Sequence, residues 1–283
     1  MDTKKIQVSL ILLFIFIFNN NSAFGKTKPK KELIEQTKNC IIVYGDTRTN
    51  HNIHQEIVNS IIKLKPVAVF HTGDLVANGN VKTQWCIFNS ITKDLLKITK
   101  FYPALGNHEK DSHLYFDNFE LPNNERWYTV DIDNIHFIVI DTNPKIEKES
   151  KQYKWLENDL KNIKSNIKYK IAIFHHPPFS SGPHREDEKG LRKSIVPLFE
   201  KYGLDIAFSG HDHIYERLFR NNIFYIVTGA GGAPLYKKKR DLPFSQKFVS
   251  EYSFCCMYKK KNKLIVDIFD RKLKLIDTFY IKK

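Results

Sequence analysis

The sequence has few cysteines, and they show no pattern typical of a zinc finger or a redox pair. Cys40, Cys86, Cys255 and Cys256 are the only ones in 283 residues, and none has C-x-x-C spacing. A chain of this length can bury a sizeable core without disulfides. Neighbouring residues of a strand point to opposite faces, so Cys255 and Cys256 face different ways. We interpret the cysteines as mostly structural, and their pairing stays open.

Glycine and proline are also scarce, at 12 and 11 residues, while 42% of the residues are hydrophobic and 13% are aromatic. This composition excludes collagen-like, mucin-like and wholly disordered chains, and it predicts a globular protein. Acidic residues are too few to balance the basic ones, because 31 Asp and Glu stand against 45 Lys and Arg, a formal charge of +14. The excess favours an anionic partner.

The basic residues are not accompanied by a helix-turn-helix, RRM or zinc-knuckle pattern. We therefore predict no specific nucleic-acid module. The lysine-rich runs 237–240 and 259–261 are interpreted as solvated turns between strands, the usual place of such runs.

No hydrophobic run in the sequence is long enough to cross a bilayer. The run over residues 6–18 has 13 residues, whereas a spanning helix needs about 20. Lys4 and Lys5 precede it, and small residues ending at Gly25 follow it, which is the three-part pattern of a secretory signal. We expect residues 1–25 to be a signal peptide cleaved after Gly25, so that the mature protein is secreted or periplasmic and has no stable membrane span.

The rest of the chain divides into a short leader and one domain. Residues 26–39 are polar and lysine-rich, and we expect them to form a solvated leader. We see no repeat or linker after residue 40, so residues 40–283 are predicted to form a single domain.

Short β-rich runs alternate with helical segments through the first part of this domain. The strands are predicted over 40–44, 67–70, 137–140, 170–174 and 205–208, and the helices over 54–64, 84–97, 152–163 and 191–201. This alternation predicts an α/β layered fold. Strands without helices follow from residue 223, at 223–228, 252–258, 263–270 and 273–281, and predict an antiparallel meander.

Side chains able to bind metals recur where the predicted strands end. They are Asp46 in YGDTR, Asp74 in HTGDLV, Asn107 and His108 in GNHE, His175 in FHHPP, and His211 and His213 in GHDH. Loops at the carboxyl edge of an α/β sheet can bring such distant residues together. Carboxylate, amide and imidazole groups are ligands for divalent zinc, manganese and iron.

The local spacing supports one shared cleft. Residues i and i+2 of an extended segment point the same way, so His211 and His213 can address one cleft while Asp212 points elsewhere. Glycine precedes the polar residue in four of these segments, at positions 45, 73, 106 and 210, and permits a tight turn that exposes it.

The ordered set GD, GD, GNHE, HHPP and GHDH resembles the calcineurin-like metallophosphoesterases, and GHDHIYER resembles their purple acid phosphatase branch. The resemblance runs from about residue 41 to 232. It implies a four-layer α/β/β/α sandwich, two metal ions about 3.5–4 Å apart, and hydrolysis of phosphate esters. The metals implied are iron, zinc or manganese, and their identity stays open.

The resemblance also implies six metal ligands. Asp74 bridges both ions, because a carboxylate can offer one oxygen to each. The other ligands divide between the second ion, held by Asn107, His175 and His211, and the first ion, completed by Asp46 and His213.

Further residues are implied to act on the substrate. His108 resembles the family's acid that protonates the leaving alcohol, and His184 resembles a phosphate-contacting histidine of the purple branch. Asn107 is assigned to substrate binding as well as to its metal. His176, next to a ligand, is interpreted as a neighbour that supports the site or as a solvated side chain.

Two positions depart from the family pattern. Position 48 holds Arg48 where the broad family has histidine, and a guanidinium has no lone pair for a metal. The first ion is therefore expected to be more open and more weakly held. Alternatively, Arg48 turns toward the substrate, where its forked donors suit a phosphate. Position 77 holds Ala77 where the purple branch has tyrosine, so we expect no iron–tyrosinate colour.

These observations predict an exported phosphatase that hydrolyses phosphomonoesters by a metal-bound hydroxide. G-x-S-x-G, G-x-x-x-x-G-K-[ST] and catalytic Cys–His patterns are absent from the sequence, so covalent catalysis and nucleotide-driven motors lack support. The alternatives are a phosphodiesterase acting on nucleotides or lipid head groups, and a catalytically impaired anion-binding protein of the same fold. Its expected partner is a small phosphorylated substrate, and its oligomeric state stays open.

Overall fold

The structure is a computed structural model that describes residues 30–283. The predicted signal peptide, its cleavage site after Gly25 and residues 26–29 of the leader lie outside the described residues. The remainder of the leader begins with a helix, α1 (Lys30–Gln36), that the sequence analysis did not predict. Its residue Ile34 packs against the core, so this part of the leader contacts the domain.

Thirteen strands of the described chain form two mixed sheets. The six-stranded sheet has the order β13-β12-β11-β1-β2-β3, with bounds Leu275–Lys282, Lys263–Asp270, Ser253–Lys260, Ile41–Tyr44, Ala68–His71 and Lys100–Pro103. The seven-stranded sheet has the order β10-β8-β9-β7-β6-β5-β4, with bounds Ser245–Val249, Tyr215–Arg220, Ile223–Thr228, Ile206–Ser209, Tyr169–Ile173, Ile135–Val139 and Tyr128–Ile132.

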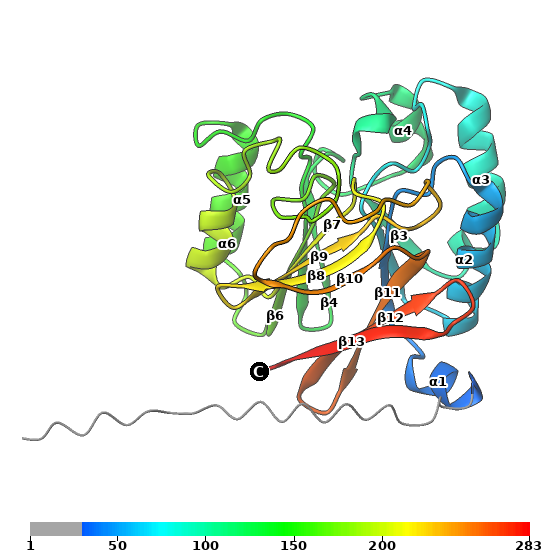
Figure 1. The fold of residues 1–283 in the computed structure, drawn as a ribbon. Coiled ribbons are helices and arrows are strands. Elements are labelled where there is room, and N and C mark those ends of the chain that lie inside the picture. The colour runs from blue at the N-terminus through cyan, green and yellow to red at the C-terminus, as the bar shows by residue number, and fades with distance from the viewer. Residues whose placement is uncertain (1–29) are drawn as a thin grey trace, which may run out of the picture.

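Helices cover the outer faces of both sheets (Figure 1). Helices α2 (His51–Leu64) and α3 (Lys82–Leu96) lie beside the six-stranded sheet, and α5 (Lys151–Lys161) and α6 (Val196–Tyr202) lie beside the seven-stranded sheet. The short helix α4 (His113–Asn118) and the 3₁₀ helix η1 (Asn107–Glu109) follow β3. The predicted four-layer α/β/β/α sandwich is confirmed.

Alternate side chains along a strand of the seven-stranded sheet belong to two different hydrophobic cores. Phe137 of β5 faces the six-stranded sheet, and its ring stacks on that of Phe70 from β2 at 4.2 Å between centroids. The next residue, Ile138, belongs instead to the core under α5 and α6. Successive side chains of a strand point to opposite faces, so one sheet packs on both sides.

Helix α2 shows how the sequence sets the outer layer. The side chain of Asn50 caps its first turn by accepting the Ile53 N–H, and Lys65 ends it with a left-handed backbone. Its apolar residues recur at helical spacing and are buried, including Ile53, Ile57 and Ile61. That buried stripe fastens the helix to the six-stranded sheet.

The predicted C-terminal meander is correct only in part. Strands β11, β12 and β13 are consecutive antiparallel neighbours, as predicted. Strand β9 lies in the other sheet, parallel to β7. Strands β3, β4, β8 and β10 were not predicted, because they are short or half-exposed and carry weak apolar alternation.

The two lysine-rich runs differ in the structure. Residues 259–261 include the tight β11–β12 turn, as predicted, and Lys261 has a left-handed backbone there. The run 237–240 precedes β10, which does not pair with β9, so it is not a hairpin tip. Arg240 turns inward and donates to the backbone oxygens of Ser180 and His184.

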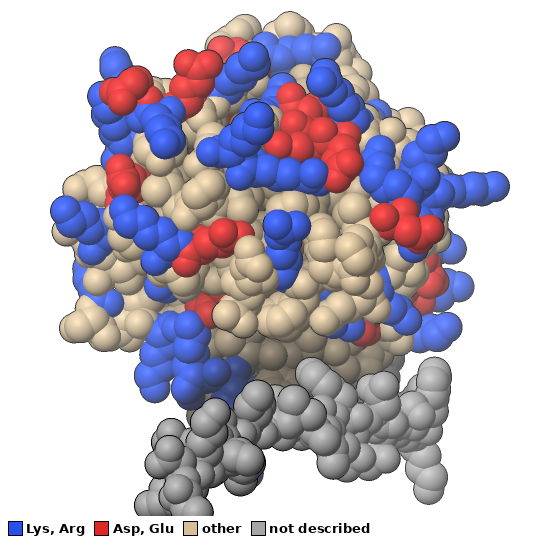
Figure 2. Space-filling model, turned by 60° about the vertical axis from the view of Figure 1, so that its left-hand side comes forward, with Lys and Arg blue, Asp and Glu red and all other residues tan. Residues whose placement is uncertain are grey.

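The surface shows mixed charge, and the cysteines are unpaired. On the face shown in Figure 2, acidic groups lie between the lysines and arginines. All four cysteines lie in the described part of the chain, and all are free thiols; Cys86 is exposed and the others are buried. Among residues 30–283 there is no helix whose length and apolar character would let it cross a membrane.

Candidate metal centre

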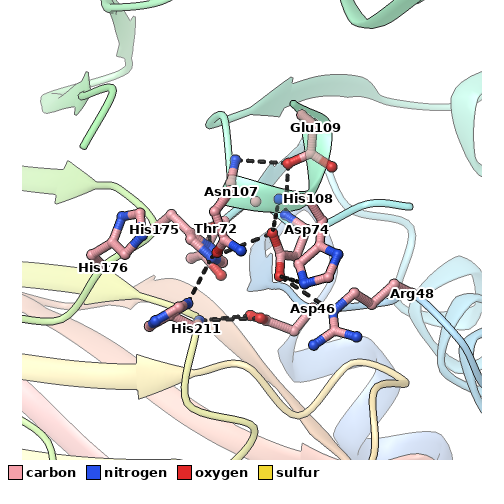
Figure 3. A network of polar contacts seen from close by, with 12 residues as sticks. Asp46, Arg48, Thr72, Asp74, Asn107, His108, Glu109, His175, His176 and His211 are labelled. Atoms are coloured by element: carbon pink, nitrogen blue, oxygen red, sulfur yellow. Dashed lines mark hydrogen bonds and ion pairs between the residues drawn. The ribbon is translucent and has the colours of Figure 1, made fainter. Parts of the chain in front are cut away.

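Five of the six predicted metal ligands meet at the carboxyl edges of the two sheets in Figure 3, and the sixth, His213, has its Nε2 3.6 Å from Asp46 Oδ1. The six-stranded sheet supplies the oxygen donors, since Asp46, Asp74 and Asn107 follow β1, β2 and β3. The seven-stranded sheet supplies the imidazoles, since His175 follows β6, and His211 and His213 follow β7. Parallel strands end at the same edge, so residues 46 to 213 reach one place.

Three of these residues have a backbone conformation that is unfavourable for side chains. Asp46, Asp74 and His211 have φ values of 56°, 59° and 67°, in the left-handed region. Strain of this kind is concentrated at functional sites, where the surrounding structure holds it in place.

The predicted reason for the preceding glycines is only partly right. Of the four, only Gly73 has a positive φ, at 97°. Gly106 is needed because the chain is crowded there, since a Cβ atom would lie 2.3 Å from Asp74 Oδ1. The absence of a side chain at Gly106 leaves room for the Asp74 carboxylate in the site.

The second metal position is a close cluster of donor atoms. His175 Nε2 lies 2.9 Å from Asn107 Oδ1, 3.2 Å from His211 Nδ1 and 3.4 Å from Asp74 Oδ1. Ligands that sit about 2.0–2.2 Å from one ion are separated by about 3–3.5 Å from each other. The four side chains therefore fit a metal ion.

Backbone carbonyls orient three of the histidines. Nδ1 of His175, His213 and His108 lies 2.9, 2.7 and 2.6 Å from the carbonyl oxygens of Thr72, Pro234 and Ala77, respectively. A carbonyl only accepts, so each Nδ1 carries a proton, and the predicted ligands His175 and His213 are left with an Nε2 lone pair that faces the site. Metal-binding histidines are commonly oriented in this way.

The first metal position contains the side chain of Arg48. Asp46 Oδ1 and His213 Nε2 are 3.6 Å apart there. Arg48 Nε lies 3.3 Å from Asp74 Oδ2, and Arg48 Nη2 lies 3.2 Å from His213 Nε2. The guanidinium thus faces two of the predicted ligands in this structure.

The charges of the site suit cations. Burial raises the pKa of Asp46, and the neighbouring Asp74 carboxylate raises it further, while Arg48 opposes this rise. Burial lowers the pKa of His213 to about 4 and also lowers the pKa of His175. Paired buried carboxylates beside neutral imidazoles form an environment that a bound cation stabilises.

Glu109 is buried beside the site and holds two of its loops, a position that was not predicted from the sequence. Its Oε2 accepts the N–H groups of Gly106 and Asp74 at 2.7 and 2.9 Å, and its Oε1 accepts that of Leu75 at 2.9 Å. Burial and the Asp74 charge raise the pKa of Glu109 to about 8. It ties the β2 loop to the β3 loop. Its place in GNHE, next to a predicted ligand and a predicted acid, was the available signal.

Asp212 has the matching role on the histidine side. Its Oδ1 lies 2.8 Å from His184 Nδ1, and its Oδ2 accepts the hydroxyl of Ser180. The His184 ring stacks on His211 at 3.8 Å between centroids, so the predicted phosphate contact lies beside the second metal position. Tyr236, which the sequence analysis did not predict, stacks on His213 at 4.2 Å.

His176 is a buried neighbour of the ligands and is not solvated. Its Nδ1 lies 2.8 Å from Thr142 Oγ1, and its Nε2 lies 3.5 Å from Glu188 Oε1. Ligand atoms of His175, His176 and His211 all lie within 4.8 Å of one another. Glu188 also approaches His211 Nε2 at 3.3 Å, so it links both rings to the loop before α6.

The chain matches the calcineurin-like phosphoesterase family over residues 41–215. It belongs to this family. The predicted resemblance is therefore confirmed, and the family implies divalent metal ions.

Similar proteins point to the purple acid phosphatase branch. The chain is 27% identical to Purple acid phosphatase 18 of Arabidopsis thaliana over 53% of its length and 38% of that protein. It is 27% identical to Acid phosphatase type 7 of Mus musculus over 68% of its length and 54% of that protein. The chain thus spans about a quarter to a half of the length of the curated relatives it matches.

A solved relative has the same fold. The purple acid phosphatase PPD1 from yellow lupin seeds superposes with a TM-score of 0.78 at 20% identity, covering 86% of this chain and 53% of that one. This likeness in fold agrees with the family match.

Proposed function

We propose that this chain is a dinuclear metal-dependent phosphatase that hydrolyses phosphomonoesters. The observation that carries the proposal is the convergence of six suitable donors from both sheets into one buried cluster. Asp74 lies between the two positions, with Oδ1 toward His175 and Oδ2 toward Arg48. When bound, two metal ions there would activate water and neutralise charge on the phosphoryl oxygens.

The protein's own groups would hold the ester and its leaving group. His184 and Arg48 offer donors to phosphate oxygens, and Asn107 lies beside them at the second metal position. His108 Nε2 lies 3.8 Å from Asp74 Oδ2, and the His108 side chain keeps 27% of its surface exposed. His108 Nε2 can therefore reach a ligand in the cleft, and the doubly protonated imidazolium would donate its Nε2 proton to the departing alkoxide.

The substrate class is tested by comparing a monoester with a diester. Turnover of p-nitrophenyl phosphate and of its bis ester is measured on the full chain, reconstituted with manganese, zinc or iron. We expect faster turnover of the monoester. Faster turnover of the bis ester would assign the protein as a phosphodiesterase instead.

The metal dependence is tested by the variant Asp74→Asn. Losing the bridging carboxylate should reduce turnover by about 10³-fold, the scale of losing one group that stabilises transition-state charge. Asp94→Asn, on the exposed surface of α3, removes a carboxylate of the same kind and should leave turnover unchanged. Equal activity of Asp74→Asn and the unchanged chain would refute the proposal.

We also propose that the protein is exported. The support is the pattern of residues 1–25, with two lysines, an apolar run and small residues ending at Gly25. Sequencing the N-terminus of the protein from its native source should find residue 26 first. An intact Met1 on protein retained in the cytosol would overturn this proposal.

A further inference from the structure

Arg48 lies among donors that the first metal ion needs. Its Nη2 lies 3.2 Å from His213 Nε2 and its Nε lies 3.3 Å from Asp74 Oδ2. A guanidinium has no lone pair, so it donates in both contacts. His213 Nε2 must then accept with its lone pair, since its Nδ1 proton is directed to the Pro234 carbonyl.

One lone pair cannot accept a hydrogen bond and bind a metal ion at the same time. The contact between Arg48 and His213 therefore excludes coordination by His213. The positive charge of Arg48 also lies against Asp74, where it offsets the negative charge that would attract the ion.

The surroundings hold Arg48 in this place. The backbone N–H groups of Thr47 and Arg48 both point to the Asp74 carbonyl, at 3.1 and 3.4 Å. The Arg48 side chain keeps only 17% of its surface exposed. On its other side, the His213 ring stacks on Tyr236, which limits how far His213 can turn away.

We propose that Arg48 is a built-in competitor for the first metal ion, so that this ion binds only when the guanidinium leaves His213 and Asp74. At the second position the hydrogen bonds described above join the ligands to one another and involve no positively charged side chain, so we expect that position to fill first. The inference rests on the metal centre of the proposed function, but it does not depend on which ester is hydrolysed.

The variant Arg48→Leu tests the competition, because leucine has neither charge nor a ligand atom. The metal-free full chain is titrated with Mn²⁺ or Zn²⁺ by calorimetry, and bound metal is counted after dialysis. We expect one tight and one weak equivalent for the unchanged chain. In Arg48→Leu the weak equivalent should tighten by about 10–100-fold, the scale of losing a charge-assisted hydrogen bond.

Two controls separate this effect from a general change of charge. Arg271→Leu removes a guanidinium that pairs with Glu56 in the unchanged chain, and it should leave both equivalents unchanged. Arg48→Lys keeps the positive charge and should give a smaller tightening than leucine. Unchanged affinity of the weak equivalent in Arg48→Leu would overturn the proposal.

A spectroscopic measurement follows Arg48 itself. Its side-chain N–H resonance is assigned by its loss in Arg48→Lys, which retains the charge. The first metal equivalent should leave the resonance in place, and the second should shift it. A shift complete at the first equivalent, or none at either, would show that Arg48 does not leave for the metal. Neither readout uses a substrate, so a failed phosphatase assay would leave the competition intact.

Discussion

The two sheets contribute different chemistry to the same site. Loops of the six-stranded sheet bring a carboxylate pair and an amide, and loops of the seven-stranded sheet bring imidazoles. Each side also has a buried carboxylate, here called a brace, that holds neighbouring groups by hydrogen bonds. The brace is Glu109 beside the loops of the six-stranded sheet and Asp212 beside the histidines of the seven-stranded sheet. Neither sheet carries a complete ligand set. The candidate centre therefore exists only where the sheets are packed together, and an ion held there would link one sheet to the other.

The largest expected effect separates reaction chemistry from metal binding. His108→Ala should lower kcat by about 10²–10⁴-fold, the range of a lost general acid. Metal content should stay at the level of the unchanged chain, because His108 is not among the proposed ligands. The measurements are steady-state kinetics and metal analysis of the same preparation. A loss of metal in step with activity would instead assign His108 to coordination.

The next effect compares the two braces. Glu109→Gln places an amide N–H₂ opposite backbone N–H groups that donate to the carboxylate in the unchanged chain. Donors would then face donors, so the change should displace the Asp74 loop. We expect metal affinity to fall by about 10–100-fold, as for other groups that orient ligands. Asp212→Asn is the matched change on the other side, and it should chiefly raise KM through His184. Equal metal affinity in both variants would remove the distinction between the braces.

Metal removal tests whether the ion joins the two sheets. At a metal concentration of 100 times Kd, binding adds about 2.7 kcal/mol to the free energy of unfolding. Chelation should then lower Tm by about 5–10 °C in a chain of this size. Thermal unfolding with and without chelator measures the change. In Asp74→Asn the chelator should have little effect, and an equal shift there would point to metal bound elsewhere.

The smallest effect lies away from the centre, within the seven-stranded sheet and its helix. His136 on β5 contacts Asp131 of β4 at 2.5 Å and Asp159 of α5 at 2.9 Å, and Lys164 also pairs with Asp131. Burial alone lowers the pKa of His136, but hydrogen bonds and charge from Asp159 and Asp131 outweigh it, so the pKa is raised.

A raised histidine pKa gives stability that is complete below the ordinary value of about 6.5 and is lost as pH rises through the folded value. His136→Gln should therefore cost about 1–2 kcal/mol in the free energy of unfolding at pH 5.5, and less at pH 9. Denaturant unfolding at both pH values measures it. His113→Gln, on the exposed side of α4, is the control. A loss independent of pH would exclude the charged pair as its source.

The sequence was sufficient for the layers and for the convergence of ligands. Apolar periodicity predicted α2, and the polar residues after β1, β2, β6 and β7 identified the edge at which they meet. Strand β10, with its half-exposed sequence, carries too little alternation to be recognised. The placement of β9 beside β7 depends on packing between distant segments, which local patterns do not encode.

The finer parts of the site depend on loops whose paths are fixed only in the folded chain. Glu109 gains its role because three N–H groups from two loops surround it. Tyr236 reaches His213 from a segment without regular structure. Arg48 was recognised as unable to bind a metal, but both directions for its side chain were open. Only the geometry shows which groups it faces.

Because Asp46, Asp74 and His211 have left-handed backbones, selection for thermal stability and selection for metal binding would favour different residues at these positions. Glycine at any of them would relieve local strain and remove a metal-binding side chain in one step. A programme that ranks substitutions by thermal resistance would favour such changes and produce robust but inert proteins. Engineering of this scaffold should hold those three positions fixed and seek gains elsewhere.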